Sequence, residues 1–461
     1  MERQIYGKLV AWKDSSRRKP LILRGVRQCG KTYILKEFGS RNYSDVVYFT
    51  FERNSTLQQV FEKDLDPHRI VKELSVIVGR KITEDTLIIF DEIQFSKTAL
   101  ASLKYFCDEA PEYHVVCAGS LLGVMLARDS RRDEQRSFPV GKVNILTMRP
   151  MGFREFLLAN GKGMLVDHVE GEYASGALSD AMLSECLTQY LDYLCVGGMP
   201  EAVDCWVREH DMGEVERIHR DIVTSYEGDF IKHAPPSMVS KIHSIWNDIP
   251  MQLSKEARRF IFGHAVPGAR SADLHEAVQW LVDAGLVHKV DVVKDIKVPL
   301  KAYSDPATYK LYYCDVGLLR TVAGLDSSSI LLPDPNYREF KGSMAENFVL
   351  NELMCDSESA PFYWTSEGKA EVDFIVPVRN MNVPIEVKSE DRVRAASLKV
   401  YVDRFLPERA VIVSKKNVRL SRIGYLPLPL MWLFRDFVGL ELPVEGVGTG
   451  PGARFDDGIS P

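Results

Sequence analysis

The chain has 461 residues, of which 45% are hydrophobic and 26% charged, and its formal net charge is −6. This length predicts roughly three domains, each large enough for a core of its own. The negative charge gives no overall sign of a nucleic-acid-binding protein. Because no run reaches the ~18 uninterrupted apolar residues of a membrane span, we expect no membrane association.

Residues 1–20 alternate charged with apolar side chains and lack the apolar core of a signal peptide. They predict an amphipathic helix that packs ahead of the first strand. The eight cysteines form no CxxC pair and lie mostly within apolar segments. This distribution favours buried free thiols in a reducing compartment over a metal site, and we expect a cytoplasmic protein.

Residues 19–39 predict a strand, a glycine-bounded loop and a helix. The apolar run KPLILRG ends at Gly25, and a helical pattern begins near Lys31 and ends at Gly39. Gly25-x4-Gly30-Lys31-Thr32 has the spacing of a phosphate-binding loop, although an ordinary strand–turn–helix can also use these glycines. The glycines let backbone N–H groups turn toward a phosphate, and the helix N-terminus adds positive potential.

In this interpretation Lys31 reaches the β- and γ-phosphates of ATP, and the Thr32 hydroxyl holds Mg²⁺. The predicted nucleotide-binding residues are Gly25, Val26, Arg27, Gln28, Cys29, Gly30, Lys31, Thr32 and, further along the chain, Asp91.

A second half of such a site follows in DTLIIFDEIQ, residues 85–94. Residues 87–90 are all apolar, as expected of a parallel strand that is buried on both faces. Asp91 and Glu92 end this strand, and two carboxylates there are costly to bury unless they face a cation or a polarised water. We expect Asp91 to hold Mg²⁺ and Glu92 to orient the attacking water. The alternative is a surface Asp-Glu pair that only ends a strand.

A third strand, YHVVCAGS, ends at Ser120, which would sense the γ-phosphate or position the water unless it is only a turn residue. Further strands are predicted at residues 46–51 and 141–148. Strands that alternate with helical stretches indicate an α/β fold with a parallel, doubly wound sheet, here of the P-loop NTPase type.

The motifs at residues 25–32, 90–94, 118–123 and 137–143 resemble those of prokaryotic AAA-type ATPases with a C-terminal domain of unknown function 4143. RPMGFREFL (149–157), GGMPEAV (197–203) and EVDFIV…IEVK (371–388) extend the resemblance over nearly the whole chain. It implies an ATPase of undefined biological role. Arg149 departs from the aromatic residue usual in this family.

The sequence does not identify the arginine that would stabilise the transition state. Arg131, Arg132, Arg149 and Arg154 are all candidates. If a neighbouring subunit supplies the arginine, the active form is a homo-oligomer, although no heptad pattern or repeat reveals one.

The middle of the chain is predicted to be mainly helical. Residues 165–245 have helical periodicity, which stops at Gly197, Gly198 and Pro200, and in an AAA-type protein such a segment lies over the nucleotide as a lid. Residues 273–293 predict a helix and then a strand, a winged-helix pattern. Because its candidate recognition helix carries three acids and no Lys or Arg, we favour packing or partner docking over DNA reading.

The last region predicts a second acidic site. Residues 370–376 and 383–389 are two alternating strands joined by the hairpin loop PVRNMN. Glu386 and Lys388 share one face of the second strand, and pairing brings Asp373 opposite them. A helix upstream carries Glu346 near its start.

Together, Glu346, Asp373, Glu386 and Lys388 resemble the core of restriction-endonuclease-like nucleases. The resemblance implies that Asp373 and Glu386 hold Mg²⁺ and that Lys388 stabilises the attacking hydroxide or the developing phosphate charge. Glu-x-Lys on a short strand is also common on solvated faces, and the fold can persist with its metal site idle.

Two functions therefore stay open. In the first, ATP hydrolysis gates a metal-dependent nuclease that acts on DNA or RNA, and residues 386–422 support it with ten Lys or Arg against five Asp or Glu, an excess of five. In the second, the chain is an ATP-driven switch or scaffold that binds a protein partner, and its last domain is only structural.

The expected organisation has five regions. They are an ATPase domain (1–160), a helical lid (161–235), a winged-helix-like region (236–330), a restriction-endonuclease-like α/β domain (331–442) and a Gly/Pro-rich tail (443–461), which composition predicts to be disordered.

Overall fold

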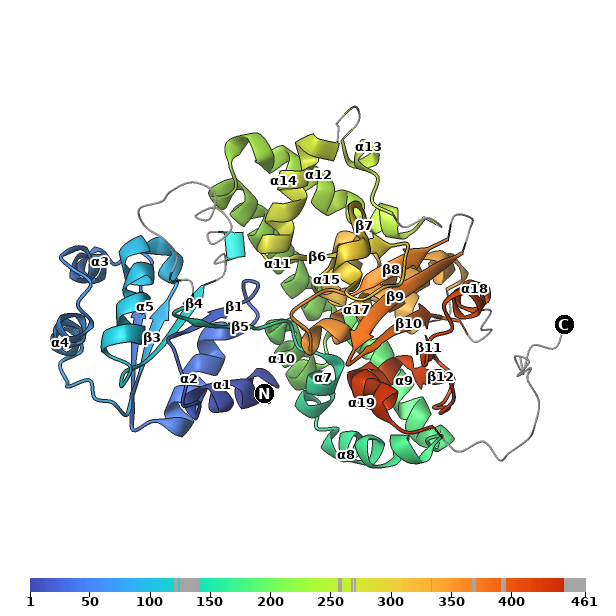
Figure 1. Ribbon diagram of the computed structural model, residues 1–461, viewed down its shortest axis with the longest axis horizontal. Coiled ribbons are helices and arrows are strands. Elements are labelled where there is room, and N and C mark those ends of the chain that lie inside the picture. Colours follow the sequence, from blue (N-terminus) through green and yellow to red (C-terminus); the bar gives the residue numbers. More distant parts are fainter. Residues whose placement is uncertain are drawn as a thin grey trace.

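A computed structural model gives the architecture of the chain (Figure 1). It describes residues 1–119, 123–124, 139, 141–255, 259–266, 268, 271–332, 334–366, 370–390 and 395–442. The expected disordered tail and Ser120 lie outside these residues. Two sheets occupy opposite ends of the long axis, and α10 (Pro200–Glu209) and α11 (Met212–His233) lie between them. No described helix is long and apolar enough to cross a membrane.

The N-terminal part folds around a parallel sheet, as predicted. Its described strands run in the order β2-β3-β4-β1-β5, and every pairing is parallel. They are β1 (Leu21–Arg24), β2 (Asp45–Thr50), β3 (Thr86–Asp91), β4 (His114–Gly119) and β5 (Asn144–Thr147). Every residue of β3 is buried, which explains its uninterrupted apolar sequence.

Helices cover both faces of this sheet, which confirms the doubly wound arrangement. They are α1 (Ile5–Lys13), α2 (Lys31–Asn42), α3 (Ser55–Glu62), α4 (Pro67–Val78) and α5 (Lys97–Glu109). Successive strand residues point to opposite faces of the sheet. Ile89 belongs to one hydrophobic core, together with Phe38 of α2, and Ile88 belongs to a second core, together with Leu103 of α5. The predicted N-terminal helix is α1.

The middle of the chain is helical, also as predicted. Besides α10 and α11 it contains α7 (Phe153–Ala159), α8 (Gly163–Glu172), α9 (Asp180–Val196), α12 (Pro236–Leu253), α13 (Phe262–Ala265), α14 (Ser271–Asp283), α15 (Val316–Val322) and α16 (Ser327–Leu331). The glycine pair ends α9 at the expected place. Gly198 is required by packing, because a Cβ there would lie 2.0 Å from the Met151 carbonyl oxygen.

The C-terminal part folds around a mixed sheet. Its described strands run in the order β12-β11-β10-β9-β8-β6-β7. They are β6 (Val287–Val293), β7 (Ser304–Tyr313), β8 (Phe362–Thr365), β9 (Glu371–Val378), β10 (Met381–Val387), β11 (Ala410–Ser414) and β12 (Ile423–Pro427), accompanied by α17 (Arg338–Cys355), α18 (Ala396–Phe405) and α19 (Phe434–Gly439). Helix α14 leads into the antiparallel pair β6–β7, and β6 also pairs with β8. The sheet therefore extends across residue 330.

The predicted hairpin at residues 370–389 is present as β9–β10, which pair antiparallel. Its loop is shorter than the six residues expected, because the strands continue to Val378 and from Met381. Arg379 has φ 52°, the positive φ that tight two-residue hairpin turns require. The register places Ile385 opposite Phe374, so Asp373 and Glu386 follow as neighbours.

Candidate functional site

The loop between β1 and α2 has a backbone that depends on its glycines. A Cβ at Gly25 would lie 2.2 Å from the Met148 carbonyl oxygen, so no side chain fits there. Gly30 has φ 93°, a conformation that glycine adopts without steric cost. Gln28 has φ 63°, which is uncommon for a residue other than glycine. These residues bring the loop back onto the N-terminus of α2, which begins at Lys31.

Lys31 lies inside this loop and is only 7% exposed. Its Nζ donates to the carbonyl oxygens of Gly25, at 2.9 Å, and Val26, at 2.7 Å. Lys31 is also the first residue of α2, and an ammonium group beside the first amides of a helix is a combination that binds phosphate oxygens in proteins.

Thr32 and Asp91 meet at the carboxyl ends of the strands. The Thr32 hydroxyl donates to Asp91 Oδ2 at 2.7 Å, and the Tyr48 hydroxyl donates to the same oxygen at 2.8 Å. The Glu92 amide donates to the other oxygen, Oδ1, at 2.9 Å. Hydroxyl and carboxylate oxygens are the ligands that Mg²⁺ prefers, so this pair fits the ion.

Glu92 lies next to this pair in a left-handed conformation, with φ 52°. Burial raises the pKa of its carboxyl, and Asp91 adds to the rise, whereas the Gln94 amide that donates to it and the charges of Lys31 and Arg27 oppose it. The charge of Lys31 therefore acts on the Glu92 carboxyl. Ser120, the other residue predicted for this edge, lies outside the described residues.

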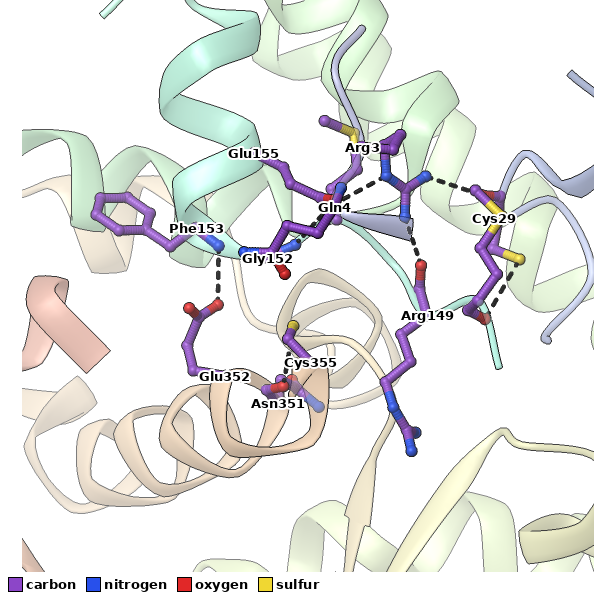
Figure 2. A network of polar contacts seen from close by, with 12 residues as sticks. Arg3, Gln4, Cys29, Arg149, Gly152, Phe153, Glu155, Asn351, Glu352 and Cys355 are labelled. Carbon is purple, nitrogen blue, oxygen red and sulfur yellow. Dashed lines mark hydrogen bonds and ion pairs between the residues drawn. The ribbon is translucent and has the colours of Figure 1, made fainter. Parts of the chain in front are cut away.

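The loop is fastened to the rest of the domain by Arg3 (Figure 2). This buried guanidinium donates to the carbonyl oxygens of Cys29, at 3.1 Å, and Arg149, at 2.7 Å, and pairs with Glu155 at 3.0 Å. The chain start, the loop and the segment after β5 are thereby joined. No local pattern in the sequence points to Arg3.

Helix α11 holds the loop from the other side. The Tyr226 hydroxyl donates to the Arg27 carbonyl oxygen at 2.9 Å, and Arg27 pairs with Asp229 at 2.7 Å. A helix of the expected lid region thus contacts the loop.

Arg149 and Arg154, two of the four arginines considered for catalysis, have other partners. Arg154 pairs with Glu170 at 2.6 Å. The guanidinium of Arg149 points away from Arg3 (Figure 2). It donates to the Ser357 carbonyl oxygen at 3.1 Å. Burial lowers the pKa of Arg149. Arg131 and Arg132 lie outside the described residues.

The C-terminal sheet brings Asp373, Glu386 and Lys388 together, as predicted from the hairpin. Lys388 Nζ lies 2.6 Å from Glu386 Oε1, and Asp373 Oδ2 accepts the Val387 amide at 2.8 Å. Burial raises the pKa of Glu386 to about 7, and Asp373 adds to the rise while Lys388 opposes it. Among the described residues, Glu386 Oε2 is a buried oxygen without a hydrogen-bond partner. The carboxylates of Glu386 and Asp373 therefore fit a divalent cation.

Two further charged residues belong to this region. Glu346, on α17, accepts the Tyr312 hydroxyl at 2.9 Å. Lys310, on β7, is fully buried, pairs with Glu371 at 2.5 Å and also lowers the pKa of Glu386. The sequence analysis missed Lys310. The described residues contain no group of three or more His, Cys, Asp or Glu placed to hold a metal ion, so the candidate metal ligands here are the pair Asp373 and Glu386.

Comparisons with known families agree with this geometry. Residues 17–157 match the model of an AAA domain, and residues 187–329 and 341–431 match two domains of unknown function, DUF8612 and DUF4143. The chain thus carries an AAA-type P-loop domain at its N-terminus, and the function of its C-terminal part is unknown. The expected resemblance is confirmed for the AAA domain and for domain 4143.

Solved structures give only distant similarities. The Walker-type ATPase paby2304 of Pyrococcus abyssi is 15% identical, with 70% of this chain and 95% of that chain covered and a TM-score of 0.44. The Aeropyrum pernix ORC1 protein in complex with DNA is 16% identical, with 72% and 93% covered and a TM-score of 0.25. The Thermotoga maritima RuvB branch migration motor is 14% identical, with 63% and 90% covered and a TM-score of 0.29.

At these TM-scores the similarities carry no argument about the function of this chain. No curated protein matches it significantly.

Proposed function

We propose that the chain binds ATP with Mg²⁺ at residues 25–32 and hydrolyses it. The observation that carries this proposal is the hydrogen bond of 2.7 Å between Thr32 and Asp91, next to the buried ammonium of Lys31. A phosphate-binding loop, a hydroxyl and a strand-end carboxylate meet at one sheet edge. This is the set of groups that phosphoryl transfer needs.

Each residue has a distinct role in this proposal. Lys31 and the loop amides bind the β- and γ-phosphates. Thr32 and Asp91 would hold Mg²⁺, which neutralises charge on the phosphate oxygens when it is bound. Glu92 orients a water and accepts its proton, for which a carboxyl with a raised pKa is suited.

The Lys31→Ala variant tests nucleotide binding. Because charge-assisted hydrogen bonds to phosphate are lost, ADP and ATP affinities should fall about tenfold or more. Equilibrium binding of a fluorescent nucleotide measures this, beside melting curves that check the fold. Lys162→Ala, which removes a lysine paired with Glu185 at 2.9 Å, is the matched control. Unchanged affinity in Lys31→Ala would contradict the assignment of the loop.

A second candidate function is metal-dependent cleavage of DNA or RNA at Asp373, Glu386 and Lys388. The buried Oε2 of Glu386 favours it, because Lys388 pairs with the other oxygen, Oε1, and a divalent cation would satisfy the Oε2 that has no hydrogen-bond partner. Lys388 would stabilise charge that develops on a phosphate. The competing proposal is an ATP-driven switch that binds a protein partner, with this domain structural.

A cleavage assay with Mg²⁺ or Mn²⁺ separates these two functions. We expect cleavage of single- or double-stranded nucleic acid by the wild type and at least about a hundredfold loss in Glu386→Ala/Lys388→Ala. The control is Lys341→Ala/Glu390→Ala, which removes a nearby surface pair at 3.6 Å. No cleavage by the wild type while ATP is hydrolysed would favour the switch.

A further inference from the structure

One face of α11 contacts the phosphate-binding loop and the short turn that follows Glu92. Tyr226, Asp229 and Lys232 are spaced three residues apart and share this face. Tyr226 and Asp229 contact Arg27 in the phosphate-binding loop. Lys232 Nζ lies 5.9 Å from the ring centre of Phe95, at the end of the short turn η1 (Ile93–Phe95) that directly follows Glu92.

The pair between Arg27 and Asp229 is asymmetric. The Asp229 side chain is 9% exposed and fixed on a long helix, whereas the Arg27 side chain is 48% exposed on a loop. Arg27 also lies close enough to Glu92 for its charge to lower the pKa of that carboxyl. The guanidinium therefore pairs with the carboxylate of α11 and also acts through its charge on the carboxyl of Glu92.

We propose that Arg27 exchanges Asp229 for the terminal phosphate of a bound nucleoside triphosphate, and that this exchange releases α11 from the loop. The proposal rests on the nucleotide binding proposed above. A guanidinium binds phosphate oxygens with two parallel hydrogen bonds, and the terminal phosphate carries more charge than one carboxylate. A diphosphate has no group at that position, so Arg27 keeps its contact with Asp229.

A movement of α11 would be transmitted to the C-terminal sheet through packed aromatic residues. Phe230 of α11 packs on Trp246 of α12, with ring centres 5.8 Å apart. The Trp246 carbonyl oxygen accepts the Tyr313 hydroxyl of β7 at 2.5 Å, and the two rings lie 4.5 Å apart. Asp229 is thus a positioning residue through which the nucleotide state biases the second half of the molecule.

The test compares ADP with the slowly hydrolysed analogue ATPγS. In Asp229→Asn the competing charge is gone, so ATPγS should bind about three- to fivefold more tightly while ADP affinity stays within about twofold. In Arg27→Ala, ATPγS should bind about tenfold more weakly, again with little change for ADP. Asp221→Asn is the matched control, because Asp221 also pairs with an arginine of α11, at 2.8 Å, but on the exposed surface.

If Asp229 had a purely structural role, its substitution would change the affinities for ADP and ATPγS equally. Equal changes in the two affinities, or no change in either, would overturn the inference. Amide hydrogen exchange gives a second readout. ATPγS, but not ADP, should increase exchange in residues 222–233 of the wild type, and Arg27→Ala should abolish this difference. A wild type that binds neither nucleotide would overturn the proposed function as well, whereas binding without discrimination by Asp229 would overturn only this inference.

Discussion

Glu92 combines two unfavourable features at one residue. Its backbone is left-handed, with φ 52°, a conformation that costs a non-glycine residue of order 1–3 kcal/mol. Its carboxyl is also partly removed from water, which raises its pKa. Both features are consistent with the catalytic role that we propose for Glu92, which directly follows the buried Asp91.

The raised pKa predicts a pH dependence. The ionised carboxylate is the form that accepts a proton from water, so activity is present above the pKa of Glu92 and is lost as the pH falls through it. The acidic limb of kcat/KM for ATP hydrolysis should therefore lie above the ~4.3 of an unperturbed glutamate. A profile that stays flat down to pH 4.5 would contradict this role.

The sequence revealed the residues whose motif is local and missed those whose partners are distant. Lys31, Thr32, Asp91 and Glu92 could be predicted because the glycine spacing and the apolar strand surround them directly. Arg3 and Asp229 contact the same loop from 26 and 202 residues away, and no periodicity encodes such a contact. Tyr48 could have been noticed, because its strand was predicted to belong to the same sheet.

Among the elements of the N-terminal sheet, apolar runs and glycines located the strands β1 to β5 and the helices α1 and α2, whereas α3 and α4 were not predicted. The hairpin β9–β10 was also predictable from its alternation, but its loop was not. Pro377 and Asn382 pair across the two strands, whereas their residue types are typical of loops. Pairing with the neighbouring strand outweighed these local preferences.

The junction of α7 and α17 depends on a buried carboxyl. Glu352 Oε1 accepts the Phe153 amide at 2.8 Å (Figure 2), which caps the first turn of α7. Burial raises the pKa of Glu352 from 4.5 to about 8. The stability that its protonated form contributes is complete below about pH 4.5 and is lost as the pH rises through about 8.

Glu352→Gln should therefore stabilise the protein more in base than in acid. Glutamine keeps an oxygen for the Phe153 amide and carries no charge. We expect the melting temperature to exceed that of the wild type at pH 8.5 and to approach it at pH 5. Thermal melting at the two pH values measures this, with Glu209→Gln at an exposed site as the control. An equal difference at both pH values would refute the account of this junction.

In the whole molecule, hydrogen bonds join the AAA-type domain to the C-terminal part. Thr147, at the end of β5, donates to Glu358 at 2.8 Å, and Arg149 reaches the Ser357 carbonyl oxygen. A cavity of about 440 Å³ lies beside this contact and is lined from both sides, by Gly25 and Arg149 and by His288 and Met354. The phosphate-binding loop and the end of α17 therefore line the same cavity.

The sequence did not indicate how the expected regions join. The middle and last regions were expected to be separate, yet β6 and β8 pair within one sheet. Their short apolar runs predict strands without specifying partners, because pairing across about 70 residues leaves no local signal. The acidic site of that sheet was found from its hairpin, whereas Lys310 came from a strand assigned to another region.

ATP hydrolysis with Glu92 orienting the water is tested by phosphate release from ATP by the wild type and the Glu92→Gln variant, with nucleotide binding measured on the same samples. We expect Mg²⁺-dependent turnover by the wild type. In Glu92→Gln we expect an ATP affinity within a few-fold of the wild type and a loss of turnover of about a hundredfold or more. Normal turnover in Glu92→Gln, or a wild type that neither binds nor hydrolyses ATP, would contradict this mechanism.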